Sequence, residues 1–138
     1  LIIGKPVAAA EKPASGPWAG FFAEGYAPAL AGLTFFARAI TPPGRSRRFD
    51  ARFFAIDASA IAKRIDITDG ELSALDWMSI EAARNLDIPN ITRVVLEDLG
   101  DRLAAGETAW QTLPAAFYHN RNGSFRRDLI SPQSRLDT

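Results

Sequence analysis

The chain has 138 residues, of which 47% are hydrophobic and 23% charged, and its formal net charge is zero. This composition predicts one ordinary soluble domain with a real core, and the zero net charge gives the chain as a whole no electrostatic reason to bind nucleic acid. The absence of cysteine excludes disulfides and thiolate metal sites and favours a cytoplasmic location. No apolar run reaches the roughly 18 residues that a membrane span needs.

The first 33 residues predict little regular structure. Residues 1–3 form a short apolar run, and residues 7–16 are rich in Ala, Pro, Gly and Ser, which is typical of a loop. Aromatic residues between Trp18 and Tyr26 favour a short helix or a packed loop. The chain does not begin with methionine, so we expect it to be a piece of a longer protein.

Residues 33–41 and 47–57 are two strand-like runs joined by a turn over residues 41–46 that contains Pro-Pro-Gly. In the second run, apolar and charged side chains alternate, which is typical of a strand with one buried face. We therefore expect an antiparallel hairpin in which Phe49 and Phe53 pack in the core.

The predicted hairpin carries one acidic residue, Asp50, and five arginines: Arg38, Arg45, Arg47, Arg48 and Arg52. Guanidinium groups bind phosphate oxygens through two parallel hydrogen bonds, and a stiff proline turn reduces the ordering entropy lost on binding. These five arginines are the predicted substrate-binding residues. The alternative is that they are solvated charges that pair with neighbours such as Asp50 and keep a sheet edge soluble.

The second half of the chain predicts one further strand, over residues 71–78, and two helices. Ser79 is a good N-cap for a short helix that ends near residue 86. Asn90 is the expected N-cap of a long amphipathic helix over residues 91–105, which Gly106 ends. Along that helix, Arg93 with Glu97, and Asp98 with Arg102, are spaced for ion pairs on the outer side.

The segment 107–138 is expected to be a C-terminal extension with a short hairpin around Asn120-Arg121-Asn122-Gly123. His119 is the only histidine, and without a nearby nucleophile it is expected to be a surface or packing residue. The glycines of residues 16–20 lack the lysine of a phosphate loop, and the acids of residues 66–71 lack the spacing of a calcium loop. The sequence therefore predicts no catalytic and no metal-binding residue.

Five segments in this order carry a family resemblance: LIIG at residues 1–4, ARAITP at 37–42, RRFDARFF at 47–54, ELSALDWMS at 71–79 and PNIT at 89–92. Together they resemble the part of bacterial Nudix hydrolases that follows the Nudix box, nearest to the branch related to acyl-CoA diphosphatases. The resemblance covers roughly residues 1–106. It implies an α+β fold with a mixed or antiparallel sheet and flanking helices, and hydrolysis of the diphosphate in a nucleotide-linked substrate, CoA-like substrates included. It also implies Mg²⁺ or Mn²⁺ held by glutamates of the box.

By this resemblance Leu1 matches the last apolar position of the box, so every glutamate that binds the metal would precede residue 1. We therefore expect residues 1–138 to be one incomplete Nudix-like domain that binds no metal and is inactive alone. Its open sheet edge predicts a homodimer, a strand-swapped assembly or completion by a partner fragment. The alternative is a non-catalytic α+β interaction or assembly module, in which the arginine hairpin docks an acidic partner.

Overall fold

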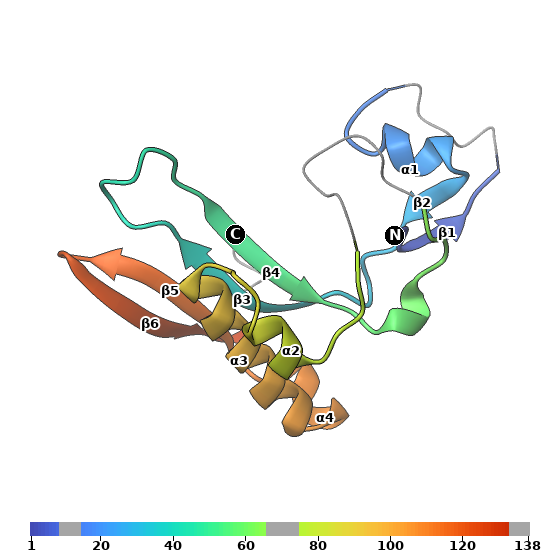
Figure 1. Ribbon diagram of the computed structural model, residues 1–138. Coiled ribbons are helices and arrows are strands. Elements are labelled where there is room, and N and C mark those ends of the chain that lie inside the picture. The colour runs from blue at the N-terminus through green and yellow to red at the C-terminus, as the bar shows by residue number, and fades with distance from the viewer. Residues whose placement is uncertain (9–14, 66–74, 133–138) are drawn as a thin grey trace. The chain divides into compact units, whose positions relative to one another are not determined.

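Residues 1–8, 15–65 and 75–132 are described by the computed structural model of this protein. Contacts among its elements divide the chain into two units: unit 1 comprises residues 1–33 and 56–76, and unit 2 comprises residues 34–55 and 77–138. Each unit has a β-sheet and at least one α-helix (Figure 1). The α+β class is therefore confirmed. Within the described ranges, the structure contains no helix with the length and apolar character needed to cross a bilayer.

Unit 1 is built on a small antiparallel sheet. Strand β1 (Gly4–Pro6) pairs with β2 (Tyr26–Pro28), and helix α1 (Ala19–Ala23) comes between them in the sequence, where either a short helix or a packed loop was expected. Position 4 requires glycine, because a Cβ there would lie 2.7 Å from the carbonyl oxygen of Ala27. Ile2 is buried and forms a β-bridge with Lys63, whose Nζ lies 2.6 Å from a carboxylate oxygen of Glu24.

A mixed four-stranded sheet forms the centre of unit 2. It contains β3 (Thr34–Ile40), β4 (Asp50–Ala55), β5 (Ala115–Arg121) and β6 (Ser124–Ile130), in the order β4-β3-β5-β6. The two outer pairs are antiparallel, whereas β3 and β5 are parallel. The predicted β3–β4 hairpin is confirmed. The segment from residue 107, expected to be an extension, supplies two strands of this sheet.

The hairpin expected around residues 120–123 is confirmed: it joins β5 to β6, and its turn has two residues. Asn122 and Gly123 have φ angles of 52° and 76°, and such a left-handed pair matches the twist of the flanking strands.

Helix α3 (Asn90–Ala104) lies across one face of this sheet (Figure 1). Its buried Val95 packs against a cluster of buried residues from the two central strands, β3 and β5: Phe36, Ala37, Ala39, Ala116 and Tyr118. The register of β3 against β4 shifts between Phe35 and Ala37, so β3 carries one extra residue there. This bulge explains why consecutive residues Phe36 and Ala37 are both buried.

One of the two phenylalanines expected in the core is there. Phe53 packs against the buried cluster, which confirms its prediction. Phe49 is 64% exposed, so its prediction is wrong. The reason is local: β4 begins at Asp50, the residue after Phe49, so Phe49 belongs to the connecting loop.

The helix ends of unit 2 match the sequence signals except at one cap. Ser79 Oγ accepts a hydrogen bond from the amide of Ala82 at the start of α2 (Ile80–Arg84), as predicted. Gly106, with φ of +84°, ends α3 ahead of the short helix α4 (Glu107–Trp110). Asn90 is the first residue of α3 rather than its N-cap, because Pro89 takes the extended conformation of the cap position.

The predicted strand over residues 71–78 is not seen. Residues 71–74 lie outside the described part of the chain, and residues 75–78 form neither strand nor helix.

Candidate functional site

Asp50 lies between two of the five predicted arginines on the β3–β4 hairpin. Arg38 binds it bidentately, with Nε 2.8 Å from Oδ1 and Nη2 2.7 Å from Oδ2, and Arg52 Nη2 lies 3.7 Å from Oδ2. The hydrogen bonds from Arg38 hold the pKa of Asp50 below its usual value and raise the pKa of Arg38. The guanidinium carbon of Arg38 also lies 4.9 Å from the ring centre of Phe117. Arg38 is therefore engaged by its own sheet.

The loop between β3 and β4 is closed at its base by Thr41. The amide of Thr41 donates to the carbonyl of Phe49 (2.9 Å), and the amide of Phe49 donates to Thr41 Oγ1 (3.0 Å). Arg48 Nε donates to the Thr41 carbonyl (3.1 Å), which ties a third arginine to the same point. Gly44, with φ of +87°, makes the turn that a side chain would strain. The loop is thus pinned where it leaves the sheet.

Arg45 and Arg47 lie in this pinned loop and are exposed, with no hydrogen-bond or ion-pair partner in the described part of the chain. The structure therefore brings the five arginines together on one hairpin but divides them into two groups. Arg38 and Arg52 flank Asp50 on the strands, and Arg45, Arg47 and Arg48 belong to the loop. Arg45 and Arg47 are therefore open to an anion, and the 55% exposed Arg52 has only the 3.7 Å contact with Asp50.

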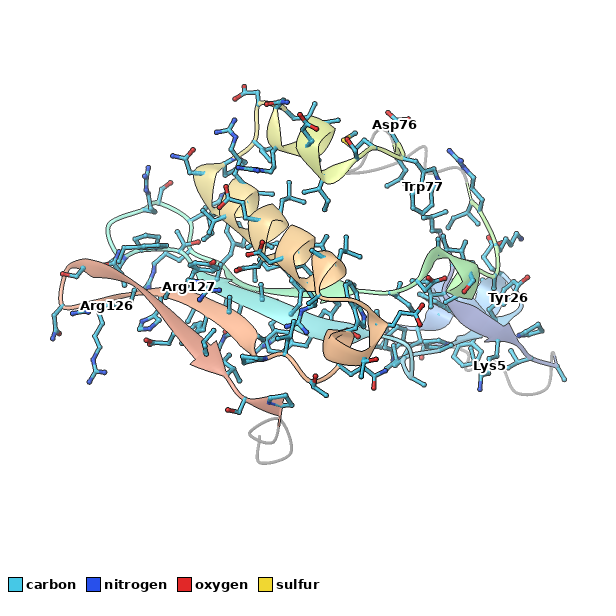
Figure 2. The ribbon with its side chains drawn as sticks, turned by 90° about the horizontal axis from the view of Figure 1, so that it is seen from below. Lys5, Tyr26, Asp76, Trp77, Arg126 and Arg127 are labelled. Carbon is cyan, nitrogen blue, oxygen red and sulfur yellow. The ribbon has the colours of Figure 1, made fainter. Side chains whose placement is uncertain are left out.

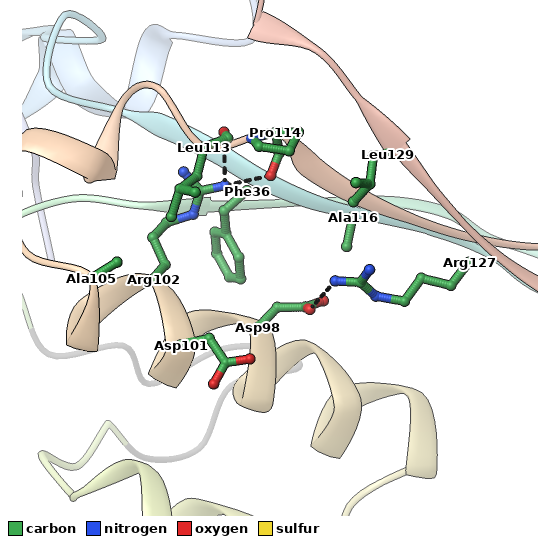
Figure 3. A pocket seen from close by; sticks show the side chains of 10 residues that line it. All are labelled: Phe36, Asp98, Asp101, Arg102, Ala105, Leu113, Pro114, Ala116, Arg127 and Leu129. Carbon is green, nitrogen blue, oxygen red and sulfur yellow. Dashed lines mark hydrogen bonds and ion pairs between the residues drawn. The ribbon is translucent and has the colours of Figure 1, made fainter.

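A separate cavity of about 350 Å³ opens in unit 2 between α3 and the β5–β6 strands (Figure 3). Its floor is apolar and includes Phe36, Ala116 and Leu129, while Asp101 and Arg127 lie at its polar side. None of the five hairpin arginines lines it. Sequence reasoning missed this cavity, because its walls come from segments that only the fold brings together.

A hydrogen-bonded triad crosses from α3 to the sheet beside the cavity. Tyr118 Oη donates to Asp98 Oδ2 (2.7 Å), and Arg127 donates to Tyr118 Oη (3.0 Å) and to Asp98 Oδ1 (2.8 Å). Burial, and then the hydrogen bond to Asp98, raises the pKa of Tyr118 to about 12. Asp98 therefore pairs with β6 and not with Arg102, so the predicted helical ion pair is wrong.

Arg102 is instead almost fully buried, at 4% exposure, and donates a hydrogen bond to the carbonyl of Trp110. It also donates to the carbonyls of Leu113 and Pro114 (Figure 3). These contacts attach the segment between α4 and β5 to α3. A buried cation satisfied by several carbonyls is a structural arrangement, because removing it would leave those oxygens without partners.

The second predicted ion pair of α3 is also wrong. Arg93 donates to the carbonyls of Arg84 and Leu86 and to Asn90 Oδ1, and Glu97 pairs with Arg84. Both errors have one cause: the α2 region and β6 offer Glu97, Arg93 and Asp98 partners outside α3.

His119 packs on the sheet, as predicted. Its ring stacks on Phe117 with 4.4 Å between ring centres, and its Nε2 lies 2.6 Å from Asp128 Oδ2.

Residues 1–8, 15–65 and 75–132 contain no group of three or more His, Cys, Asp or Glu side chains placed to hold a metal ion. Asp50 and Asp98 are each held by arginine. Mg²⁺ and Mn²⁺ prefer several oxygen ligands, and the described donor set does not fit either ion.

Comparisons of the chain with family models, with curated proteins and with solved structures each gave no match.

Proposed function

We propose that this chain is the phosphate-binding portion of a Nudix-type diphosphate hydrolase that acts on a nucleotide-linked substrate. The observation that carries the proposal is the pinned loop between β3 and β4, which presents exposed guanidinium groups on a hairpin built into a mixed sheet. The order of segments described above, which resembles the part of a Nudix hydrolase after its box, supports the same proposal.

In this proposal Arg45, Arg47 and Arg52 bind the diphosphate. Each guanidinium can donate two parallel hydrogen bonds to phosphate oxygens, and arginine stays charged at any physiological pH. The hairpin carries five arginines and one aspartate, so its local excess is four positive charges. Arg38 does not bind substrate: by holding Asp50, it keeps that carboxylate from repelling the anion.

The described residues contain no ligand set that matches the catalytic metal of this family, so no step of the reaction is assigned to this chain. The resemblance places the metal-binding glutamates on a segment other than residues 1–138. The chain by itself is then a binder of the substrate and not a catalyst.

Titration of the chain with ADP and with CoA, followed by calorimetry, tests the binding role. We expect weak binding that the double change Arg45→Ala with Arg47→Ala reduces about thirtyfold, because the two lost charge-assisted contacts contribute of order 1 kcal/mol each. The matched control is Arg64→Ala, which removes one exposed arginine from unit 1. Equal affinity in the double variant and the wild type would contradict the proposal.

Hydrolysis is tested separately, with CoA and Mg²⁺ and chromatographic detection of the released nucleotide. We expect no turnover by the chain alone, and turnover when a peptide with the Nudix glutamates is supplied. Robust turnover by the chain alone would show that its own side chains hold the metal.

A second function is favoured by one observation: Arg45 and Arg47 lie on an exposed loop, and neither they nor Arg52 line the cavity of unit 2. An exposed cationic loop suits an acidic protein surface as well as a small diphosphate. In that case a polyglutamate peptide would bind through the same arginines and ADP would not.

A further inference from the structure

Among the described strands, β6 is an open edge of the sheet in unit 2. It is the last strand in the order β4-β3-β5-β6, and six of its seven residues are exposed. Phe125 and Leu129 are 59% and 58% exposed, although both are large apolar side chains. A long exposed edge strand with apolar side chains is a template for pairing with another strand.

The register of the β5–β6 hairpin shows which main-chain groups of β6 face outward. The two-residue turn makes Arg121 and Ser124 the closing pair, which exchanges both of its hydrogen bonds. Because such pairs alternate along an antiparallel ladder, residues 124, 126, 128 and 130 bond to β5. The amides and carbonyls of Phe125, Arg127 and Leu129 therefore point toward the open edge.

The side chains of β6 also alternate. Arg127 and Leu129 line the cavity on the α3 side, and Phe125 stacks on Tyr118 there, with 5.9 Å between ring centres. Arg126 and Asp128 lie on the opposite face, where Asp128 contacts His119. Arg126 extends away from the ribbon (Figure 2), and it has no ion-pair partner within the described ranges.

We propose that β6 pairs antiparallel with β6 of a second copy of this chain, centred on Arg127. A two-fold axis perpendicular to the sheet leaves the α3-side faces of both copies on the same side of the joined sheet. Residues of the two copies then lie opposite one another when their numbers sum to twice 127. Arg126 then lies opposite Asp128 of the partner copy, twice, and Phe125 lies opposite Leu129, twice. Cross-strand pairs of both kinds stabilise a sheet.

The same register satisfies the main chain. Phe125, Arg127 and Leu129 are the residues whose amides and carbonyls face outward, and all three fall at hydrogen-bonded positions of the new ladder. The two central arginines do not repel strongly, because each is held by Asp98 of its own chain at 2.8 Å.

Other registers lose this complementarity. A centre at Arg126 or at Asp128 places like charges directly opposite one another, which destabilises a sheet. A centre at Phe125 or at Leu129 leaves Arg126 and Asp128 without opposite charges. Charged residues ordinarily protect an edge strand from pairing, whereas here their order makes the edge complementary to itself.

A charge-reversal series tests the pairing by sedimentation equilibrium of the full chain. We expect the wild type to have twice the 15.0 kDa mass of one chain. Arg126→Asp and Asp128→Arg should each weaken the dimer about tenfold or more, since each change puts like charges opposite one another twice. The double variant exchanges the two charges and should restore the dimer. Arg121→Asp makes the same charge change on the same hairpin outside the paired stretch, and should leave the dimer intact.

Leu129→Pro supplies a second test that does not depend on charge. Proline removes an amide that points away from β5, so the hairpin can keep its own hydrogen bonds while the new ladder is blocked. We expect a folded monomer, with the fold checked by circular dichroism.

Amide hydrogen exchange of the wild type completes the test without any variant. The amides of Phe125, Arg127 and Leu129 should become protected as concentration rises, and those of β4 should not. A wild-type monomer at all soluble concentrations, or a dimer unaffected by both Arg126→Asp and Leu129→Pro, would overturn the proposal.

Discussion

Unit 2 uses arginine differently on the α3 side of its sheet and on the β3–β4 hairpin. On the α3 side, Arg102 and Arg127 are bound by carbonyls, a carboxylate and a phenol of their own unit. In the hairpin loop, Arg45 and Arg47 are exposed and lack a partner in the described part of the chain. The same residue type is structural where α3 and the α4–β5 segment surround it, and open to a ligand where the chain leaves the sheet. An arginine is therefore a candidate binding residue only after its internal partners are known.

The largest difference between the two regions should appear at Arg102. We expect Arg102→Ala to lower the free energy of unfolding by about 3 kcal/mol, because three partly buried carbonyls lose their donor. Arg93→Ala is the matched control, since it also removes a donor to two carbonyls but at an exposed site, and should cost about 1 kcal/mol. Urea denaturation measures both. Equal losses would show that burial does not distinguish the two arginines.

The two phenylalanines of β4 and its loop make the next largest contrast. Phe53→Ala should lower the free energy of unfolding by about 2 to 3 kcal/mol, because Phe53 packs against the core cluster under α3. Phe49→Ala should change it by less than about 0.5 kcal/mol, because Phe49 is exposed. The same urea experiment measures both. A large loss for Phe49→Ala would mean that the loop carries part of the core.

Tyr118→Phe tests how much the Tyr118 hydroxyl stabilises the α3 side of the sheet. Loss of the hydroxyl between Asp98 and Arg127 should cost about 1 to 2 kcal/mol at neutral pH. The pKa of Tyr118 is raised from 10 to about 12 in the folded state, so the hydroxyl stabilises the fold below pH 10 and this contribution falls as the pH rises toward 12. The stability difference between wild type and variant should shrink over that range. A difference independent of pH would show that the proton of Tyr118 contributes nothing.

Asp50→Asn should give the smallest effect on stability, because the hairpin pair is exposed to solvent and screened. The pKa of Asp50 is lowered in the fold, so its pairing with Arg38 stabilises above pH 3.8 and is lost as the pH falls below that value. Removing this charge should also raise the affinity for ADP about two- to threefold, because Arg52 no longer pairs with a carboxylate. Calorimetry with ADP measures this change, and weaker binding would show that Asp50 positions Arg38 for the ligand.

Local signals in the sequence predicted most of the elements of unit 2. These signals are the alternation of residues 47–57, the Asn122-Gly123 turn, the Ser79 cap and Gly106. Each acts within a few residues, so the local structure that it favours could be predicted without knowledge of the fold. The five arginines of the candidate site were found for the same reason, because they are close together along the chain.

The tertiary structure alone decided which of those side chains are available. The parallel pairing of β3 with β5 joins segments about 80 residues apart, and it places Phe117 under Arg38. The partners of Asp98, Arg102 and Glu97 come from β6, the α4–β5 segment and α2, not from the next turn of α3. A charged side chain takes the partner that desolvation and geometry favour in three dimensions, and helical spacing predicts that partner only where no other element packs nearby. For this protein the sequence determined where the arginines are concentrated, and the packing of α3 and the sheet determined which of them can meet an anion.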